Sequence, residues 1–309
     1  MRALNRVTSH RRASVPGRCI FLGCHLAATL GQVTPPLPPG YVRTVPGRGE
    51  MFYRHHQGGE PGAPTLLLLH GWTASADLQW FTAYRQLGEK YPYIAVDHRG
   101  HGRGIRSVTP FSLEDCADDA MALVAELGVD KVVPVGYSMG GPISLLVWQR
   151  HREHVAGLVL AATALEWQST WRDRWDWAFL PFSESVFRSR LASTGVALWA
   201  RLVGRDEPLP HREWFLSELR RSDPRALVEA GRCLRHFDAR GFASQVDVPA
   251  AMVVTTKDRL VKPFKQHALA DAVQAAVVEM RGDHLCTVTH GADFADRLRQ
   301  AVDKVSHQV

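Results

Sequence analysis

The most constraining feature of the chain is a five-residue turn between a strand-like run and a helix-like run. Gly136-Tyr137-Ser138-Met139-Gly140 follows the apolar residues 132–135 and precedes the helical pattern of residues 143–149. A bare G-x-S-x-G pattern also occurs in ordinary glycine-rich turns. Between a strand and a helix, however, it indicates a strained serine whose Oγ is lifted above a sheet, where a base and a substrate carbonyl reach it. The pattern therefore predicts a nucleophilic Ser138.

From residue 40 onward, strand-like and helix-like segments alternate along the chain. Continuous apolar runs such as residues 65–69 are typical of strands buried on both faces of a parallel sheet. The alternation predicts an α/β fold with a doubly wound, mostly parallel sheet. Pro134 lacks an N–H, so we expect a local irregularity in its strand. The predicted strands cover 41–45 and 51–56 (an antiparallel hairpin), 65–69, 93–96, 132–135, 157–161, 250–255 and 275–280, and helices cover 113–127 and 292–305.

A serine nucleophile needs a histidine to remove its proton and a carboxylate to fix the tautomer of that histidine. His284 lies just beyond the last predicted strand, and Asp258 follows the strand before it. Both loops fall at the sheet edge that carries Ser138, because the carboxyl ends of parallel strands share one edge. Ser138, Asp258 and His284 are therefore the predicted catalytic residues, as nucleophile, acid and base.

Other histidines and aspartates are weaker candidates for these roles. His267 falls in a helical stretch, and His290 is expected to enter the final helix. Asp238 and Asp247 precede their strand and would lie at its wrong end. Asp283 adjoins His284 in sequence and is too close to point back at it.

These motifs, with two others, resemble those of α/β-hydrolases of the esterase, lipase and cofactor-free haloperoxidase type, over about residues 40 to 309. His70-Gly71-Trp72 is similar to the H-G-x oxyanion motif of that family, and residues 97–102 resemble its D-x-R-G-x-G turn. The resemblance implies that the backbone N–H groups of Trp72 and Met139 bind the oxyanion, while the second motif has a structural role. The order Ser138, Asp258, His284 is also that of the family.

The resemblance also implies a division of the chain into a core and an inserted helical cap. The α/β-hydrolase core would comprise residues 40–163 and 243–309, with the cap at 164–242. Six of the nine tryptophans lie in the cap segment. They indicate an aromatic pocket for an apolar group, or side chains that pack the cap onto the body.

Residues 1–39 are expected to be a disordered, basic and proline-rich extension. Residues 1–49 hold seven arginines and no acidic residue, so the net charge of +6 arises from this end and the remaining chain is near neutral. That distribution gives no case for a nucleic-acid-binding surface. A weak signal-like pattern leaves export open as an alternative to the cytoplasm. Five scattered cysteines without C-x-x-C spacing favour reduced thiols in the cytoplasm and no metal site, and no 18-residue apolar run suggests a membrane span.

The sequence as a whole predicts a serine hydrolase that cleaves carboxylic esters of apolar acyl groups through an acyl-enzyme. Its partner would be a small-molecule ester, with no metal and no organic cofactor. A carbon–carbon bond hydrolase of ring-cleavage products is an alternative, because that group shares the S-M-G-G sequence found at Ser138. A non-catalytic ligand-binding protein of the same fold is another. An epoxide hydrolase is disfavoured, since those enzymes carry aspartate at the position of Ser138.

Overall fold

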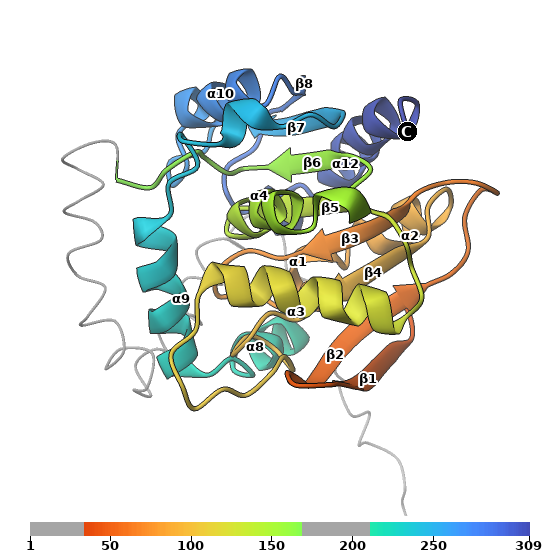
Figure 1. The fold of residues 1–309 in the computed structure, drawn as a ribbon, viewed down its shortest axis with the longest axis vertical. Helices are drawn as coiled ribbons and strands as arrows, with labels where there is room; N and C mark the ends of the chain where they lie inside the picture. Colours follow the sequence, from red (N-terminus) through yellow and green to blue (C-terminus); the bar gives the residue numbers. More distant parts are fainter. Residues whose placement is uncertain (1–33, 169–210) are drawn as a thin grey trace, which may run out of the picture.

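A mixed eight-stranded β-sheet runs through the centre of the computed structural model, which describes residues 34–168 and 211–309 (Figure 1). Its strand order is β1-β2-β4-β3-β5-β6-β7-β8. The pairs β1–β2 and β2–β4 are antiparallel and all others are parallel, which confirms the predicted fold class. The strands are β1 (Gly40–Val45), β2 (Gly49–His56), β3 (Thr65–Leu69), β4 (Tyr93–Val96), β5 (Val132–Tyr137), β6 (Leu158–Ala161), β7 (Ala250–Thr255) and β8 (Ala276–Met280).

Strand β5 lies in the middle of the sheet and leads directly to Ser138. Its ladder with β3 runs unbroken through Pro134, from the Thr65↔Val132 pair to the Leu69↔Gly136 pair. Its ladder with β6 begins only at Val135, after an isolated bridge at Val132. The interruption thus lies on the β6 side, which matches the irregularity expected from the missing N–H of Pro134.

Helices cover both faces of the sheet. In Figure 1, α3 and α4 lie across the near face, and α2 and α12 lie behind the sheet. Helix α3 begins at a capping box in which Ser112 and Asp115 satisfy each other's backbone N–H groups. The helices are α1 (Ala76–Trp80), α2 (Tyr84–Gly88), α3 (Leu113–Glu126), α4 (Gly140–Arg150), α8 (Arg212–Leu219), α9 (Pro224–His236), α10 (Pro263–Ala272), α11 (Cys286–Thr289) and α12 (Gly291–Ser306), with short 3-10 turns η1 (Arg152–His154) and η2 (Ala243–Gln245).

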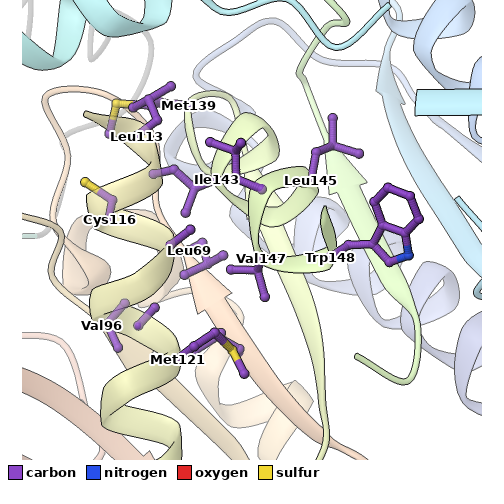
Figure 2. Close-up of a cluster of buried hydrophobic side chains, with 14 of the residues drawn as sticks. Leu69, Val96, Leu113, Cys116, Met121, Met139, Ile143, Leu145, Val147 and Trp148 are labelled. Atoms are coloured by element: carbon purple, nitrogen blue, oxygen red, sulfur yellow. The ribbon is translucent and has the colours of Figure 1, made fainter. Parts of the chain in front are cut away.

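Each face of the sheet is sealed by its own cluster of buried apolar side chains. Figure 2 shows part of the cluster between α3, α4 and the sheet, where Leu113 of α3 and Ile143 of α4 pack with Leu69 of β3. Met139 belongs to the same cluster and is fully buried. The side chain of Met139 is therefore a packing group of the core and takes no part in the solvent-facing side of the turn.

Helices α8 and α9 fall within the segment predicted as a cap. Trp214 of α8 is buried with Leu78 and Phe215, and Trp167 packs against the larger cluster on the body. The sequence allowed these tryptophans either to line a pocket or to pack the segment onto the body, and these two pack. The other four lie outside the described residues, and the division into core and cap stays a prediction.

The described chain starts with a segment that contacts the body before the first strand. Pro35 is buried, Leu37 packs against the apolar clusters, and the Pro38 carbonyl accepts a hydrogen bond from Arg54 Nη1 at 2.6 Å. The chain therefore meets the body a few residues before the boundary expected at residue 39, because proline rings and carbonyls supply packing and acceptors. Residues 1–33 of the predicted extension lie outside the described residues. Within the described ranges, no helix has both the length and the apolar character that a bilayer span requires.

The turn at Ser138 depends on backbone contact between the strand and helix that flank it. A Cβ built on Gly140 would overlap the carbonyl oxygen of Leu69, and one built on Gly136 would overlap the carbonyl oxygen of Gly140. Both obstacles are backbone atoms of the central sheet or of the turn itself, so neither can move aside cheaply. Only glycine therefore fits at positions 136 and 140 of this turn.

Replacement of Gly140 by alanine is expected to destabilise the fold by about 3 kcal/mol or more, because overpacking against fixed backbone cannot relax. Gly241→Ala is the matched control, since no atom lies within 4 Å of a Cβ built there. Urea unfolding followed by circular dichroism measures both. A Gly140→Ala variant as stable as Gly241→Ala would show that the turn has more room than the backbone indicates.

Candidate active site

Four loops meet at the carboxyl edge of the parallel strands. They follow β3, β5, β7 and β8 and carry Trp72, Ser138, Asp258 and His284, respectively. This edge is where ligands bind in open α/β sheets. The structure thus places all predicted site residues at one end of the sheet.

Ser138 stands on a strained turn between β5 and α4. Its φ angle of 51° lies in the left-handed region, where a residue with a side chain is unfavourable. Its N–H donates to the Ala161 carbonyl of the neighbouring strand at 2.9 Å, which fixes the backbone in that conformation. Helix α4 begins two residues later, so its N-terminal dipole end faces the region of the serine hydroxyl.

His284 links Ser138 to Asp258 through both ring nitrogens. Its Nε2 lies 3.0 Å from Ser138 Oγ, and its Nδ1 lies 2.7 Å from Asp258 Oδ2. Because the carboxylate can only accept, Nδ1 carries the proton and Nε2 is left to accept one from the serine hydroxyl. The three residues predicted from the sequence therefore form one hydrogen-bonded chain, although Ser138 and His284 are 146 positions apart.

The Asp258 carboxylate is buried and has its full set of donors. Oδ1 accepts from the N–H groups of Leu260 and Val261 at 2.8 and 2.9 Å. Oδ2 accepts from Thr255 Oγ1 at 3.0 Å and Gln266 Nε2 at 3.4 Å, in addition to His284. These bonds hold the carboxylate in one orientation beside the imidazole. Sequence reasoning missed Thr255 and Gln266, since a buried strand-end threonine and a helical glutamine carry no pattern of their own.

The loop that carries His284 is held from two sides. The hydroxyl of Tyr137, the residue before the candidate nucleophile, donates to the His284 carbonyl at 2.9 Å. On the other side, the N–H of Thr256 donates to the Met280 carbonyl at 2.9 Å and that of Lys257 to the Gly282 carbonyl at 3.0 Å. The loops that carry Asp258 and His284 are therefore bonded to each other through their backbones.

The weaker candidates from the sequence lie in other surroundings. Asp283 is exposed, and its Oδ1 accepts from the N–H of Leu285 at 2.9 Å. His290 lies between α11 and α12, and His267 lies on α10 with Glu279 nearby at 3.9 Å. Asp238 pairs with Arg240, and Asp247 accepts from Trp148 before β7 begins.

The loop after β3 comes within contact distance of the serine. A Cβ built on Gly71, the residue before Trp72, would lie 3.3 Å from Ser138 Cβ. The N–H of Gly71 itself donates to Gln79 Oε1 at 3.2 Å. Of the two predicted oxyanion donors, Met139 follows Ser138 in the same turn and Trp72 follows Gly71 in the loop after β3, and their role stays a prediction.

Three buried histidines lie behind this loop. His70 accepts from the N–H of His98 through Nε2 at 3.0 Å, and its Nδ1 lies 2.8 Å from the Gly71 carbonyl. The ring centroids of His98 and His101 lie 4.3 and 5.3 Å from that of His70. Burial lowers the pKa of all three, to about 3 for His98 and about 4 for His101. All three are neutral packing groups. Among the described residues, no group of three or more histidine, cysteine, aspartate or glutamate side chains is arranged to hold a metal ion.

Residues 97–102, the second family-like motif, have the structural role that the resemblance implied. Asp97 accepts from the N–H groups of Ala76 and Arg103, both at 2.7 Å. Arg99 pairs with Asp119 of α3. These bonds tie the loop after β4 to α1 and α3.

Comparison with known proteins agrees with this architecture. Residues 64–283 match the family model described as alpha/beta hydrolase fold. The AB hydrolase superfamily protein YisY of Bacillus subtilis is 23% identical over 203 residues, which cover 64% of this chain and 75% of that protein. The bifunctional esterase/perhydrolase DCH of Acinetobacter calcoaceticus is 37% identical over 102 residues, which cover 33% of this chain and 36% of that protein.

Solved structures show the same fold. The esterase EaEST from Exiguobacterium antarcticum superposes with a TM-score of 0.73 at 19% identity, covering 86% of this chain and all of that one. A hydrolase from Pseudomonas aeruginosa gives a TM-score of 0.72 at 19% identity, covering 85% and 98%. The chain belongs to the α/β-hydrolase family. We therefore assign it to the hydrolases of this fold.

Acidification is expected to destabilise the fold through the buried histidines. Burial lowers the pKa of His101 to about 4, from 6.5 in the unfolded chain, so the unfolded state gains the proton first as the pH falls. The stability that the neutral ring contributes is present above pH 6.5 and is lost toward pH 4, about 2 kcal/mol by pH 4.5. Asp97 acts in the opposite direction, because burial raises its pKa to about 6 and its protonation favours the folded state.

His101→Asn isolates this contribution, because asparagine retains a donor for the Arg99 carbonyl but does not titrate. Between pH 7 and 4.5, its free energy of unfolding in urea should fall by about 2 kcal/mol less than that of the unsubstituted chain. The exposed His290 provides the control variant His290→Asn. Equal losses in the His101→Asn variant and the unsubstituted chain would contradict the expectation.

Proposed function

We propose that the chain is a serine hydrolase that cleaves carboxylic esters of apolar acyl groups through an acyl-enzyme. The observation that carries this proposal is the hydrogen-bonded chain from Ser138 through His284 to Asp258. Such a chain activates a hydroxyl nucleophile for acyl transfer. Family membership and the esterase activity named for the Acinetobacter calcoaceticus relative support ester hydrolysis within that chemistry.

In the proposed acylation step, Ser138 Oγ attacks the ester carbonyl carbon while His284 Nε2 takes the hydroxyl proton. The positive charge that forms on the imidazole is stabilised by Asp258, which accepts from Nδ1–H at 2.7 Å. The carbonyl oxygen becomes an oxyanion bound by the N–H groups of Trp72 and Met139. His284 then returns the proton to the leaving alkoxide as the tetrahedral intermediate collapses to the acyl-enzyme.

In the proposed deacylation step, His284 acts as the base for a water molecule. The water attacks the acyl carbon, its proton passes to Nε2, and a second oxyanion occupies the same donors. Collapse releases the carboxylic acid and returns the proton to Ser138 Oγ. No metal or organic cofactor enters either step.

We infer that the substrate is a small molecule and that the chain acts in the cytoplasm. The described thiols of Cys116, Cys233 and Cys286 are unpaired, which is usual in a reducing compartment. Cell fractionation with a C-terminal tag tests the location. Recovery of the chain outside the cytoplasm would favour the exported alternative.

A panel of p-nitrophenyl esters from acetate to octanoate tests the function and the size of the acyl site. Each acyl methylene buried against an apolar wall contributes about 0.8 kcal/mol, so kcat/KM should rise by roughly tenfold over two methylenes that fit. Butyrate to octanoate should be preferred to acetate. Ser138→Ala should lower turnover at least about 10⁴-fold without changing the thermal unfolding midpoint.

The alternatives have distinct outcomes in the same panel. Turnover of a vinylogous 1,5-diketone with no turnover of esters would favour the carbon–carbon bond hydrolase. Binding of esters without turnover would favour the ligand-binding protein. A steady fall in kcat/KM from acetate upward would mean that the acyl site is small.

Asp258→Asn should lower kcat by about 10⁴-fold. An asparagine whose Oδ1 accepts from Leu260 and Val261 turns its NH₂ group toward His284 Nδ1. The imidazole then carries its proton on Nε2 and cannot accept one from Ser138. Asp283→Asn is the control, because an amide oxygen still accepts from the N–H of Leu285. Steady-state kinetics measure kcat for both variants. A larger loss of kcat from Asp283→Asn than from Asp258→Asn would show that Asp258 is not the acid.

A further inference from the structure

The loop after β3 makes a tight turn with a strained residue beside the nucleophile. The Ala74 N–H donates to the Gly71 carbonyl at 3.3 Å, which closes a four-residue turn. Thr73 within it has a φ of 64°, a conformation that a β-branched side chain disfavours. Such residues persist only where surrounding contacts fix them. The turn that presents the Trp72 backbone therefore needs support from elsewhere.

The support comes partly from α9, far away in the sequence. The indole Nε1–H of Trp72 donates to the Leu227 carbonyl at 2.7 Å, across 155 residues. The rest of the Trp72 side chain packs against the apolar cluster that contains Leu69 and Ile143. One side chain thus connects the strained turn to the first part of α9.

Helix α9 is itself fixed on the body near this turn. Asp223 caps its N-terminus by accepting from the N–H of Arg225 at 2.8 Å, and the Asp223 N–H donates to the Gly100 carbonyl at 2.7 Å. Ala226 lies so close to Gly100 that a Cβ on the glycine would overlap it. The Leu227 carbonyl is therefore a fixed acceptor, one residue beyond this contact.

We infer that the Trp72 indole is a positioning group that holds the oxyanion turn through the Leu227 carbonyl of α9. This inference rests on the proposed function, since it concerns the same oxyanion donors. It assigns α9 a part in transition-state stabilisation. The backbone N–H of Trp72 binds the oxyanion, and its side chain fixes where that N–H lies.

Trp72→Phe removes the indole N–H and retains an aromatic ring. With p-nitrophenyl butyrate, kcat should fall about ten- to a hundredfold, because small misplacement of a catalytic donor has effects of that size. KM should change less than about threefold, since the ester carbonyl needs the donor mainly in the transition state. The inhibition constant of a trifluoromethyl ketone, whose serine adduct carries an oxyanion, should rise in parallel with the loss in kcat. The pH profile of kcat/KM should stay unchanged, because it reports on His284.

Trp148→Phe is the matched control. Its indole Nε1–H donates to Asp247 Oδ1 at 3.0 Å, before β7 begins and at the opposite end of that strand from Asp258. Loss of that donor should leave kcat and the inhibition constant unchanged. If Trp72→Phe folds poorly, 3-benzothienylalanine at position 72 retains the shape of tryptophan without the N–H, and the same losses should follow.

A second substitution tests whether the indole acts on the turn. Thr73→Gly removes the strain at φ 64°, so the turn no longer depends on an outside contact. The loss in kcat caused by Trp72→Phe should then be several-fold smaller in the Thr73→Gly background.

The results separate this inference from the proposed function. An unsubstituted chain that turns over no ester contradicts the proposed function. If that chain is active, a Trp72→Phe variant with kcat within twofold of it overturns the inference alone. Equal losses from Trp72→Phe in both backgrounds overturn it as well, because the indole would then act outside the turn.

Discussion

The close contact between the Ser138 turn and the central strands sets the geometry of everything around it. Helix α4 starts with Gly140 against the Leu69 carbonyl, so the end of β5 and the start of α4 can only meet through a tight bend. That bend requires the positive φ of Ser138, which its hydrogen bond to Ala161 keeps in place. The height of the hydroxyl above the sheet, the direction of α4 and the distance to the loop after β3 all follow from this one contact.

The polar groups around Ser138 form a linear series of hydrogen bonds. The hydroxyl meets the imidazole, and the imidazole meets a carboxylate that accepts five hydrogen bonds from fixed donors. Burial makes these contacts strong, and it also makes each unsatisfied atom costly. The buried carboxylate of Asp258 therefore needs donors such as Thr255 and Gln266 in addition to His284.

The sequence predicted the features of the structure that follow from the order of its strands along the chain. Apolar runs located the strands, and the rule that parallel strands end at one edge placed Ser138, Asp258 and His284 together. It did not predict the bond from Tyr137 to the His284 carbonyl or the bond from Trp72 to Leu227. Each joins a side chain to a distant backbone atom, so it depends on how far a helix or loop is shifted along its neighbour. Side-chain packing determines that shift, and no sequence pattern predicts it.

The backbone bonds between the acid and base loops have a consequence for thermal motion. Thr256 and Lys257 donate to the carbonyls of Met280 and Gly282, so Asp258 and His284 move as one unit at the outer strands of the sheet. Ser138 belongs to the sheet centre, and the Tyr137 hydroxyl is a link between the two parts. Relative displacement therefore lengthens the gap between His284 and Ser138 before it disturbs the pairing of His284 with Asp258. Warming would therefore first break the hydrogen bond between Ser138 and His284, while the imidazole keeps its orientation against Asp258.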